Sequence, residues 1–218
     1  MLKLYGFAAS NYYSKVKLIL LEKGVTFEEV LVWPGEKARF MDKTPLGKVP
    51  FIETEHGSLC ESQVIADYIE VTYTDVPLLP SDPFAAAKVH EIITFLDWHL
   101  EMVARELLPS AFFGATASDE TKARVKASLQ KNLAAFAQLT RCTPYLAGNE
   151  FSLADCVAAV HFPFISGISK IMFGEDLLAA LPLADYQKLL ASRPHVQQVR
   201  ADSQANLALL MEHIKTLR

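Results

Sequence analysis

The chain has 218 residues, of which 51% are hydrophobic and 21% are charged, and its formal net charge at pH 7 is −4. This length and apolar content allow a substantial buried core, which excludes a disordered chain and indicates one large domain or two small ones. The slight acidic excess argues against a basic surface for nucleic acid, so the expected partner is a small molecule or another protein.

Neither a targeting signal nor a membrane span is predicted. The opening MLKLYGFAAS has no basic stretch followed by a continuous apolar run, and no apolar run reaches about eighteen residues. Cys60, Cys142 and Cys156 lie far apart without a CxxC pair, and the histidines show no paired ligand spacing. We therefore expect a soluble, unprocessed protein of the reducing cytoplasm, without a metal and without a membrane or nucleic-acid partner.

The first part of the chain changes its hydrophobic period about every ten residues, as alternating strands and helices do. The pattern predicts a strand, helix, strand, short helix, hairpin and final helix over residues 2–7, 13–24, 26–32, 36–42, 49–60 and 61–73. This βαβαββα order implies a small mixed sheet in which the first two strands are parallel and the hairpin adds antiparallel strands.

The remainder keeps a helical spacing of apolar residues and is predicted to be all helical. The expected helices cover residues 84–108, 118–139, 153–165, 177–190 and 196–217. The fold class is therefore an α/β domain at 1–76 and an all-α domain at 84–218, joined by a linker at 77–83. No fixed-period repeat or low-complexity tract is present, which excludes solenoids and propellers.

The first candidate for chemistry is Ser10, a hydroxyl between the first strand and the first helix. A helix N-terminus offers unpaired N–H groups and the positive end of the dipole, so an anion is stabilised there. The alternative is that Ser10 only caps the helix. Tyr5, Tyr12, Tyr13 and Ser14 are rival hydroxyls in the same region.

The second candidate is Pro50 in TPLGKVPFIE, at the head of an apparent central strand. Proline is unfavourable there because it cannot donate to the strand ladder. A cis Val49–Pro50 bond would resolve this and leave the Val49 backbone free to pair with an extended, peptide-like ligand. The alternative is a trans proline at a strand start.

Two helix starts complete the set. At Glu61-Ser62 the hydroxyl and the first N–H groups could receive a carboxylate while Glu61 receives an ammonium group, although the pair could also be a simple cap. Ser152 and Asp155 stand three residues apart before an apolar helix. We interpret this second pair as a capping box that stabilises the fold and takes no part in chemistry.

Together, four pieces of the chain resemble the cytosolic glutathione transferase superfamily in its serine-type, bacterial-like form. They are SNYYSKVKLILLEKG, TPLGKVPFIE, CESQVIADYIE and LAGNEFSLADCVAAV, in this order. The resemblance covers nearly the whole chain. It implies a thioredoxin-like first domain with Pro50 as its cis proline, and a helical second domain that covers the pocket for an electrophile.

The resemblance also implies residue roles. Ser10 would hydrogen-bond the glutathione sulfur, and the backbone of Val49 would bracket the peptide. Lys48 would meet a carboxylate, and Glu61 with Ser62 would hold the γ-glutamyl end. Gly35 stands where some relatives have a polar side chain, which leaves Lys37, Trp33 or no side chain for the glycine end. Asn11 replaces the usual proline, so Tyr5, Tyr12 and Tyr13 stay open as donors to the sulfur.

The implied activity is a glutathione transferase that activates the thiolate for attack on small hydrophobic electrophiles, as in detoxification, and that works as a homodimer. Two alternatives stay open. One is a binding or regulatory protein that keeps the fold without conjugation, since a fold does not settle a function. The other is a glutathione-dependent isomerase or reductase, although Ala9-Ser10 offers no catalytic cysteine at that turn.

Overall fold

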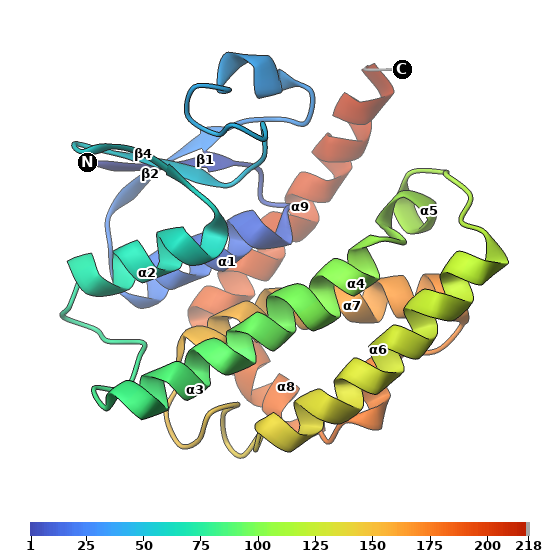
Figure 1. Cartoon of the computed structure of the whole chain (residues 1–218). Helices are drawn as coiled ribbons and strands as arrows, with labels where there is room; N and C mark the ends of the chain where they lie inside the picture. The colour runs from blue at the N-terminus through green and yellow to red at the C-terminus, as the bar shows by residue number, and fades with distance from the viewer. Residues whose placement is uncertain (217–218) are drawn as a thin grey trace. The chain divides into compact units, whose positions relative to one another are not determined.

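The N-terminal part of the chain folds around a four-stranded mixed sheet of order β2-β1-β3-β4 (Figure 1). The computed structural model describes residues 1–216, without the side chains of residues 37, 38 and 216. The strands are β1 (Leu2–Gly6), β2 (Phe27–Leu31), β3 (Phe51–Thr54) and β4 (Gly57–Cys60). β1 pairs in parallel with β2 and antiparallel with β3, which forms a hairpin with β4.

Side chains alternate between the two faces of this sheet. Leu4 and Ile52 pair across β1 and β3 and are fully buried. α1 (Asn11–Glu22) and α2 (Ser62–Thr72) pack against each other and the sheet, on one face of it in Figure 1. The short 3-10 helix η1 (Glu36–Arg39) lies beyond the other face. The observed order of elements confirms the predicted thioredoxin-like βαβαββα fold.

The second part of the chain is helical, as predicted. Its elements are α3 (Pro83–Thr94), η2 (Phe95–Glu101), α4 (Met102–Arg105), α5 (Leu108–Phe112), α6 (Asp119–Leu139), α7 (Leu153–Phe173), η3 (Leu177–Ala180) and α8 (Ala184–Ser192). α7 contacts η2, α3, α4, α5 and η3, so it is the central helix of this bundle.

α7 is long and apolar enough to cross a membrane by length and composition alone, as is no other helix in the described part of the chain. Half of its most apolar window is buried inside the protein, and Asp155, His161 and Ser169 are buried along it. A helix that is apolar almost all round and surrounded by other helices is typical of a protein core.

Three predicted helices differ from the observed ones. The segment predicted as one helix at 177–190 divides into the 3-10 helix η3 and α8, which begins at Ala184. The segment predicted as one helix at 84–108 contains a π-helical stretch, η2, whose buried Asp97 lies 2.8 Å from the ring of His161 in α7. A π-helical turn shifts which side chains face a neighbouring helix. The helix predicted at 153–165 extends to Phe173, because Pro163 is accommodated inside it and Gly174 in the left-handed conformation ends it.

The chain divides into two compact units at a different place from the predicted boundary. Residues from Ser192 onward, mostly α9 (Pro194–Thr216), group with Met1–Leu78, whereas the sequence placed them with the helical domain at 84–218. The physical reason is a set of ion pairs. Arg193 lies 2.6 Å from Glu22, and Lys17 lies 2.8 Å from Asp202.

The capping box at the start of α7 is present and extends further than the sequence predicted. The fully buried carboxylate of Asp155 accepts hydrogen bonds from the N–H and hydroxyl of Ser152, both at 2.9 Å. It also accepts from the Leu146 N–H at 3.0 Å and the Tyr186 hydroxyl at 2.8 Å. Burial raises the pKa of Asp155, and these hydrogen bonds oppose that rise. One carboxylate thus joins the loop before α7 to α8.

We expect Asp155→Ala to lower the free energy of unfolding by at least about 3 kcal/mol, because several buried donors lose their acceptor at once. Chemical denaturation measures this loss. Asp185→Ala is the control, since the Asp185 carboxylate in α8 is exposed and pairs only with a surface lysine among the described residues. That control should change stability by less than about 0.5 kcal/mol. Equal stability of the two variants would contradict the structural role of Asp155.

Candidate functional site

The predicted site residues lie next to strand ends along one edge of the sheet, where the chain enters or leaves the strands. β1 is parallel to β2, and β3 is antiparallel to both β1 and β4, so the ends of β1, β2 and β4 lie beside the start of β3. The register places Gly6 opposite Leu31, and Phe51 opposite both Tyr5 and Cys60. Ser10, Val49 and Glu61 therefore follow or precede strand ends at this common edge.

Ser10 is the N-cap of α1, as the alternative interpretation had it. Its backbone is extended, and its Oγ accepts from the Tyr13 N–H at 3.4 Å, which is longer than a typical N–H···O bond. A hydroxyl can accept one hydrogen bond and donate another. Capping therefore leaves the proton of Ser10 available for a ligand at the positive end of the helix dipole.

The Val49–Pro50 peptide bond is cis, which confirms the prediction from the placement of the proline. The loop before it is held by Thr44, whose Oγ1 donates to the Lys48 carbonyl at 2.8 Å and accepts from the Lys48 N–H at 3.2 Å. No residue in the described part of the chain is hydrogen-bonded to the Val49 main chain. The Lys48 side chain is exposed, whereas Pro50 is buried.

Gly6 allows the end of β1 to approach this loop closely. It has a φ of +148°, and a Cβ at this position would lie 2.5 Å from the Tyr13 ring and 3.2 Å from the Cβ of Val49. No side chain fits within such a distance of a buried ring, so glycine is required here. The close approach brings Val49 beside the first turn of α1.

Glu61 precedes α2 in a strained backbone conformation. Its φ is +69°, unusual for a residue other than glycine, and its side chain is exposed and makes no capping hydrogen bond. Ser62 is buried at the first position of the helix. Strained conformations of this kind cost roughly 1–3 kcal/mol and concentrate at functional sites.

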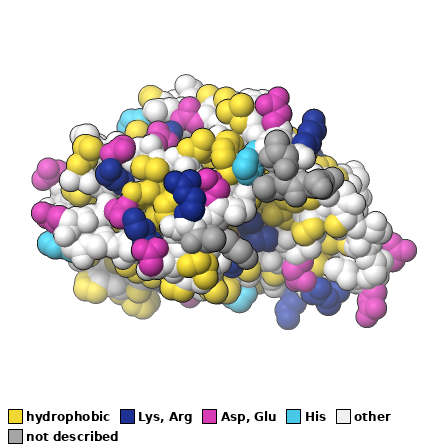
Figure 2. All heavy atoms as spheres, turned by 90° about the horizontal axis from the view of Figure 1, so that it is seen from above, with side chains coloured by type: hydrophobic (Ala, Val, Ile, Leu, Met, Phe, Trp, Pro, Cys, Tyr) yellow, Lys and Arg dark blue, Asp and Glu magenta, His cyan; other side chains and the backbone are white. Residues whose placement is uncertain are grey.

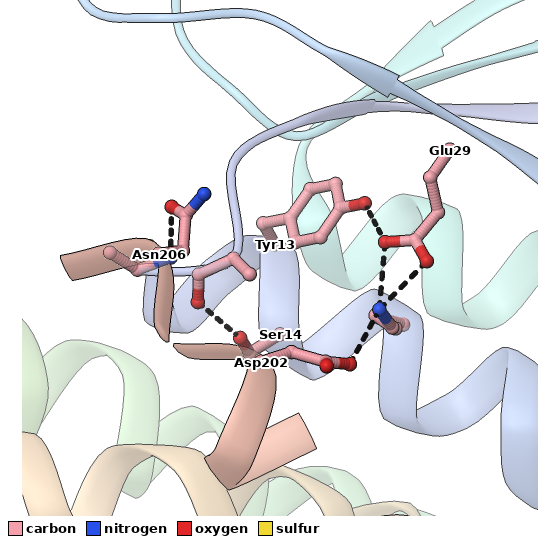
Figure 3. Close-up of polar contacts among 8 residues, drawn as sticks. Tyr13, Ser14, Glu29, Asp202 and Asn206 are labelled. Atoms are coloured by element: carbon pink, nitrogen blue, oxygen red, sulfur yellow. Dashed lines mark hydrogen bonds and ion pairs between the residues drawn. The ribbon is translucent and has the colours of Figure 1, made fainter. Parts of the chain in front are cut away.

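Two of the three alternative tyrosine donors already bind carboxylates. The Tyr5 hydroxyl donates to Glu53, which also pairs with Lys43 at 2.6 Å. The Tyr13 hydroxyl donates to Glu29 at 2.5 Å (Figure 3). Burial and the nearby Glu53 raise the pKa of Tyr5 to about 12, and burial with Glu29 raises that of Tyr13 further. Tyr12 is half-buried at the start of α1.

Two residues are expected at the glycine end of the ligand, Lys37 and Trp33. The side chain of Lys37 lies outside the described residues. Trp33 follows β2, and its ring is stacked on His213 of α9 at 5.3 Å between centroids. The backbone N–H of Trp33 donates to the Glu36 carboxylate at 2.8 Å. This bond, together with Arg39, lowers the pKa of Glu36 despite its partial burial.

Sequence reasoning missed the contribution of α9. Asn206 Oδ1 accepts from the Ala9 N–H at 3.0 Å, one residue before Ser10, and Asp202 pairs with the buried Lys17 (Figure 3). His213 Nε2 lies 3.0 Å from the Pro34 carbonyl. The spacing of Asp202, Asn206 and His213 puts them on one face of a helix, which was the available signal.

Charged side chains form no basic surface on the face shown in Figure 2, where positive and negative groups are interspersed. Ion pairs of the sheet region join Lys3 with Glu28 at 3.2 Å and Lys43 with Glu53 at 2.6 Å. Among the residues whose side chains are described, no group of three or more His, Cys, Asp or Glu is placed to hold a metal ion.

Tyr5 should ionise near pH 12 and not near its ordinary value of 10.0. Because folding raises this pKa, the stabilisation linked to the protonated phenol is complete below pH 10 and is lost as the pH rises from about 10 to 12. Ultraviolet titration of the wild type against Tyr5→Phe isolates the Tyr5 signal, and Glu53→Gln should move it toward 10. A Tyr5 signal centred near pH 10 in the wild type would refute the Glu53 contact.

Comparisons with known proteins show which family the chain resembles. The family profile described as Glutathione S-transferase, N-terminal domain, matches residues 4–77. A glutathione S-transferase of Pseudomonas putida is 39% identical over 217 residues, covering 99% of each protein. FtsZ-localized protein A of Caulobacter vibrioides is 29% identical over 216 residues, covering 94% of this chain and 93% of the relative.

A solved structure gives the same result. A glutathione S-transferase from Methylobacterium radiotolerans, in complex with glutathione sulfonate, is 28% identical and superposes with a TM-score of 0.73. The match covers 91% of this chain and 93% of the other. These findings confirm the resemblance of the four sequence pieces, and the chain belongs to the glutathione S-transferase family.

Proposed function

We propose that the chain binds glutathione at the sheet edge of its first unit and that the Ser10 hydroxyl stabilises the glutathione thiolate for attack on small hydrophobic electrophiles. The observation that carries this proposal is the position of Ser10. Its hydroxyl caps α1 through a long hydrogen bond and keeps its proton, at the same edge as the Val49 main chain, which has no hydrogen-bond partner among the described residues.

The other edge residues fit the parts of a peptide ligand. The Val49 N–H and carbonyl pair with the peptide backbone, as an added strand would. The first N–H groups of α2 at Ser62 receive the α-carboxylate of the γ-glutamyl end, and the exposed Glu61 carboxylate receives its ammonium group. The Lys48 ammonium, with Lys37 or Trp33, meets the carboxylate at the glycine end.

Thiol activation follows from electrostatics. A cysteine thiol has a pKa of about 8.5, so only a few per cent is thiolate at pH 7. A hydrogen bond from the Ser10 hydroxyl and the positive end of the α1 dipole favour the anion and lower this pKa. The thiol proton leaves to solvent, and the thiolate forms a carbon–sulfur bond to the electrophile. In a substitution the leaving group departs with its electron pair, and in an addition the π electron pair moves to the neighbouring atom, which takes a proton from solvent. The chain itself forms no covalent intermediate.

The hydrogen bonds that Tyr5 and Tyr13 already make favour Ser10 as the donor to the sulfur. The Tyr5 and Tyr13 hydroxyls donate to Glu53 and Glu29, so each would have to leave a carboxylate to reach a sulfur. Tyr12 is the remaining phenol in the first turn of α1 and is the matched control for the assignment.

Ser10→Ala should lower turnover with an aromatic electrophile by about ten- to a thousandfold, because one charge-stabilising donor is lost. Glutathione affinity, measured by calorimetry, should change far less, since the peptide is held by other residues. Tyr12→Phe should keep most of the turnover. The reverse result, an active Ser10→Ala and an inactive Tyr12→Phe, would assign the donor role to the tyrosine.

The second candidate is a protein that binds glutathione without conjugating it. Asn11 in place of the usual proline favours it, as does the similarity to FtsZ-localized protein A, whose name describes a location and not a reaction. Glutathione binding without turnover of conjugation, isomerisation or disulfide-reduction substrates would select this candidate. Cys60, Cys142 and Cys156 form no disulfide with one another, which supports a reducing, cytoplasmic location, where conjugation would serve detoxification.

We also propose that the protein is a homodimer. Phe84, Trp98 and Met102 of the helical unit expose large apolar side chains, with Phe84 at 76% and Trp98 at 66%. Such exposed apolar surface is typical of an interface, and a stable pair should bury at least about 1,000 Å² in total.

Trp98→Glu should convert the protein to a monomer, because a charge in an apolar interface loses its hydration without gaining a partner. Sedimentation at micromolar concentration measures the change from twice the chain mass to one. Lys131→Glu in α6 is a control with a charge change at another exposed position. A wild type that sediments at the mass of one chain would rule out the dimer.

A further inference from the structure

The turn that carries Ser10 is held by hydrogen bonds within the N-terminal segment and by one hydrogen bond from far along the sequence. The Ser10 N–H donates to the Phe7 carbonyl at 3.0 Å, and the Ser14 hydroxyl donates to the Ala8 carbonyl at 2.9 Å. Both are local to the turn and α1. The long-range bond joins the Ala9 N–H to Asn206 Oδ1 at 3.0 Å, across 197 positions of the sequence. Figure 3 shows Asn206 reaching from α9 to this turn.

Contacts on both sides of Asn206 hold α9 in place. One helical turn earlier, Asp202 pairs at 2.8 Å with Lys17, which is buried and also contacts Glu29 at 2.7 Å (Figure 3). Near one end of α9, Arg193 pairs with Glu22 at 2.6 Å. Toward the other end, His213 contacts the Pro34 carbonyl. Contacts at both ends fix the rotation of the helix, so the Asn206 amide faces the turn.

We propose that Asn206 is a positioning residue for Ser10, and that α9 thereby forms part of the thiol-activating apparatus. This inference rests on the proposed function. The side chain of Asn206 acts through the Ala9 N–H and has no contact with the ligand in this proposal. It sets the direction of the backbone one residue before the donor, and hence where the Ser10 hydroxyl points.

The expected consequence is selective. A donor that is displaced by a fraction of an ångström loses much of its effect on a developing anion. The affinity for the peptide part of glutathione is unchanged, because other residues bind it. Loss of the Asn206 acceptor should therefore raise the pKa of the bound glutathione thiol and lower kcat. The KM for glutathione should stay close to that of the wild type, because Val49 and Ser62 do not depend on this contact.

The experiment compares Asn206→Leu, which has a similar shape without an acceptor, with Asn206→Asp, which keeps an acceptor oxygen at the same place. Gln204→Leu is the matched control, because it removes an exposed amide from the same helix. For each protein, the ultraviolet absorbance of bound glutathione is titrated against pH, and kcat and KM are measured with an aromatic electrophile. Hydrogen exchange of residues 7–10 is measured without ligand.

For Asn206→Leu we expect a raised thiol pKa, a kcat lowered about tenfold, an unchanged KM, and faster exchange of the Ala9 amide. Asn206→Asp should lie nearer to the wild type, and Gln204→Leu should match it. Wild-type thiol pKa and kcat in Asn206→Leu would overturn the proposal, as would an equal loss in Gln204→Leu. Unchanged exchange of Ala9 would overturn it even if Asn206→Leu were too unstable for kinetics.

Failure of the proposed function gives a different result. In that case the wild type itself binds no glutathione or shows no thiolate signal, whereas the exchange measurement still tests the contact between Asn206 and Ala9. If the wild type activates the thiol and Asn206→Leu does so equally well, only the positioning role fails.

Discussion

The arrangement of the first unit depends on one buried ammonium group. Lys17 lies on α1, where its side chain is 5% exposed, and it contacts Glu29 of β2 and Asp202 of α9. Burial alone would lower the pKa of Lys17, but its hydrogen bonds to Asp202 and Glu29 outweigh this effect and raise the pKa. Without both carboxylates the buried ammonium of Lys17 would be an uncompensated charge, which is destabilising. The charge therefore obliges β2 and α9 to stay beside α1.

This constraint has consequences at the sheet edge. Glu29, held by Lys17, accepts the Tyr13 hydroxyl, and Asp202 stands one helical turn from Asn206. The ring of Tyr13 in turn approaches Gly6 so closely that no other residue fits there. The turn before Ser10 is thus held by packing on one side and by the hydrogen bond that its Ala9 N–H donates to Asn206 of α9 on another. A precisely directed donor needs this rigidity.

The helical unit uses the same principle with a carboxylate. Asp155 gathers donors from the loop before α7 and from Tyr186 of α8, while Asp97 pairs with His161 inside the bundle. In both units one buried ionisable side chain binds hydrogen-bonding groups from segments that are distant in the sequence. Its removal would therefore affect several elements together. The apolar periodicity of the helices decides that they pack, and these polar groups decide in which register they do so.

Much of this protein can be predicted from residues that stand close together in the chain. The βαβαββα order, the cis bond at Pro50 and the capping box of Asp155 follow from local periodicity, from the inability of proline to donate and from a three-residue spacing. Only the tertiary structure showed that α9 belongs with the first unit, that Tyr5 and Tyr13 face carboxylates, and that Asn206 meets Ala9. The reason is that a buried lysine or an amide on a helix requires a partner but does not specify which of many distant residues provides it; the packing of the whole unit makes that choice.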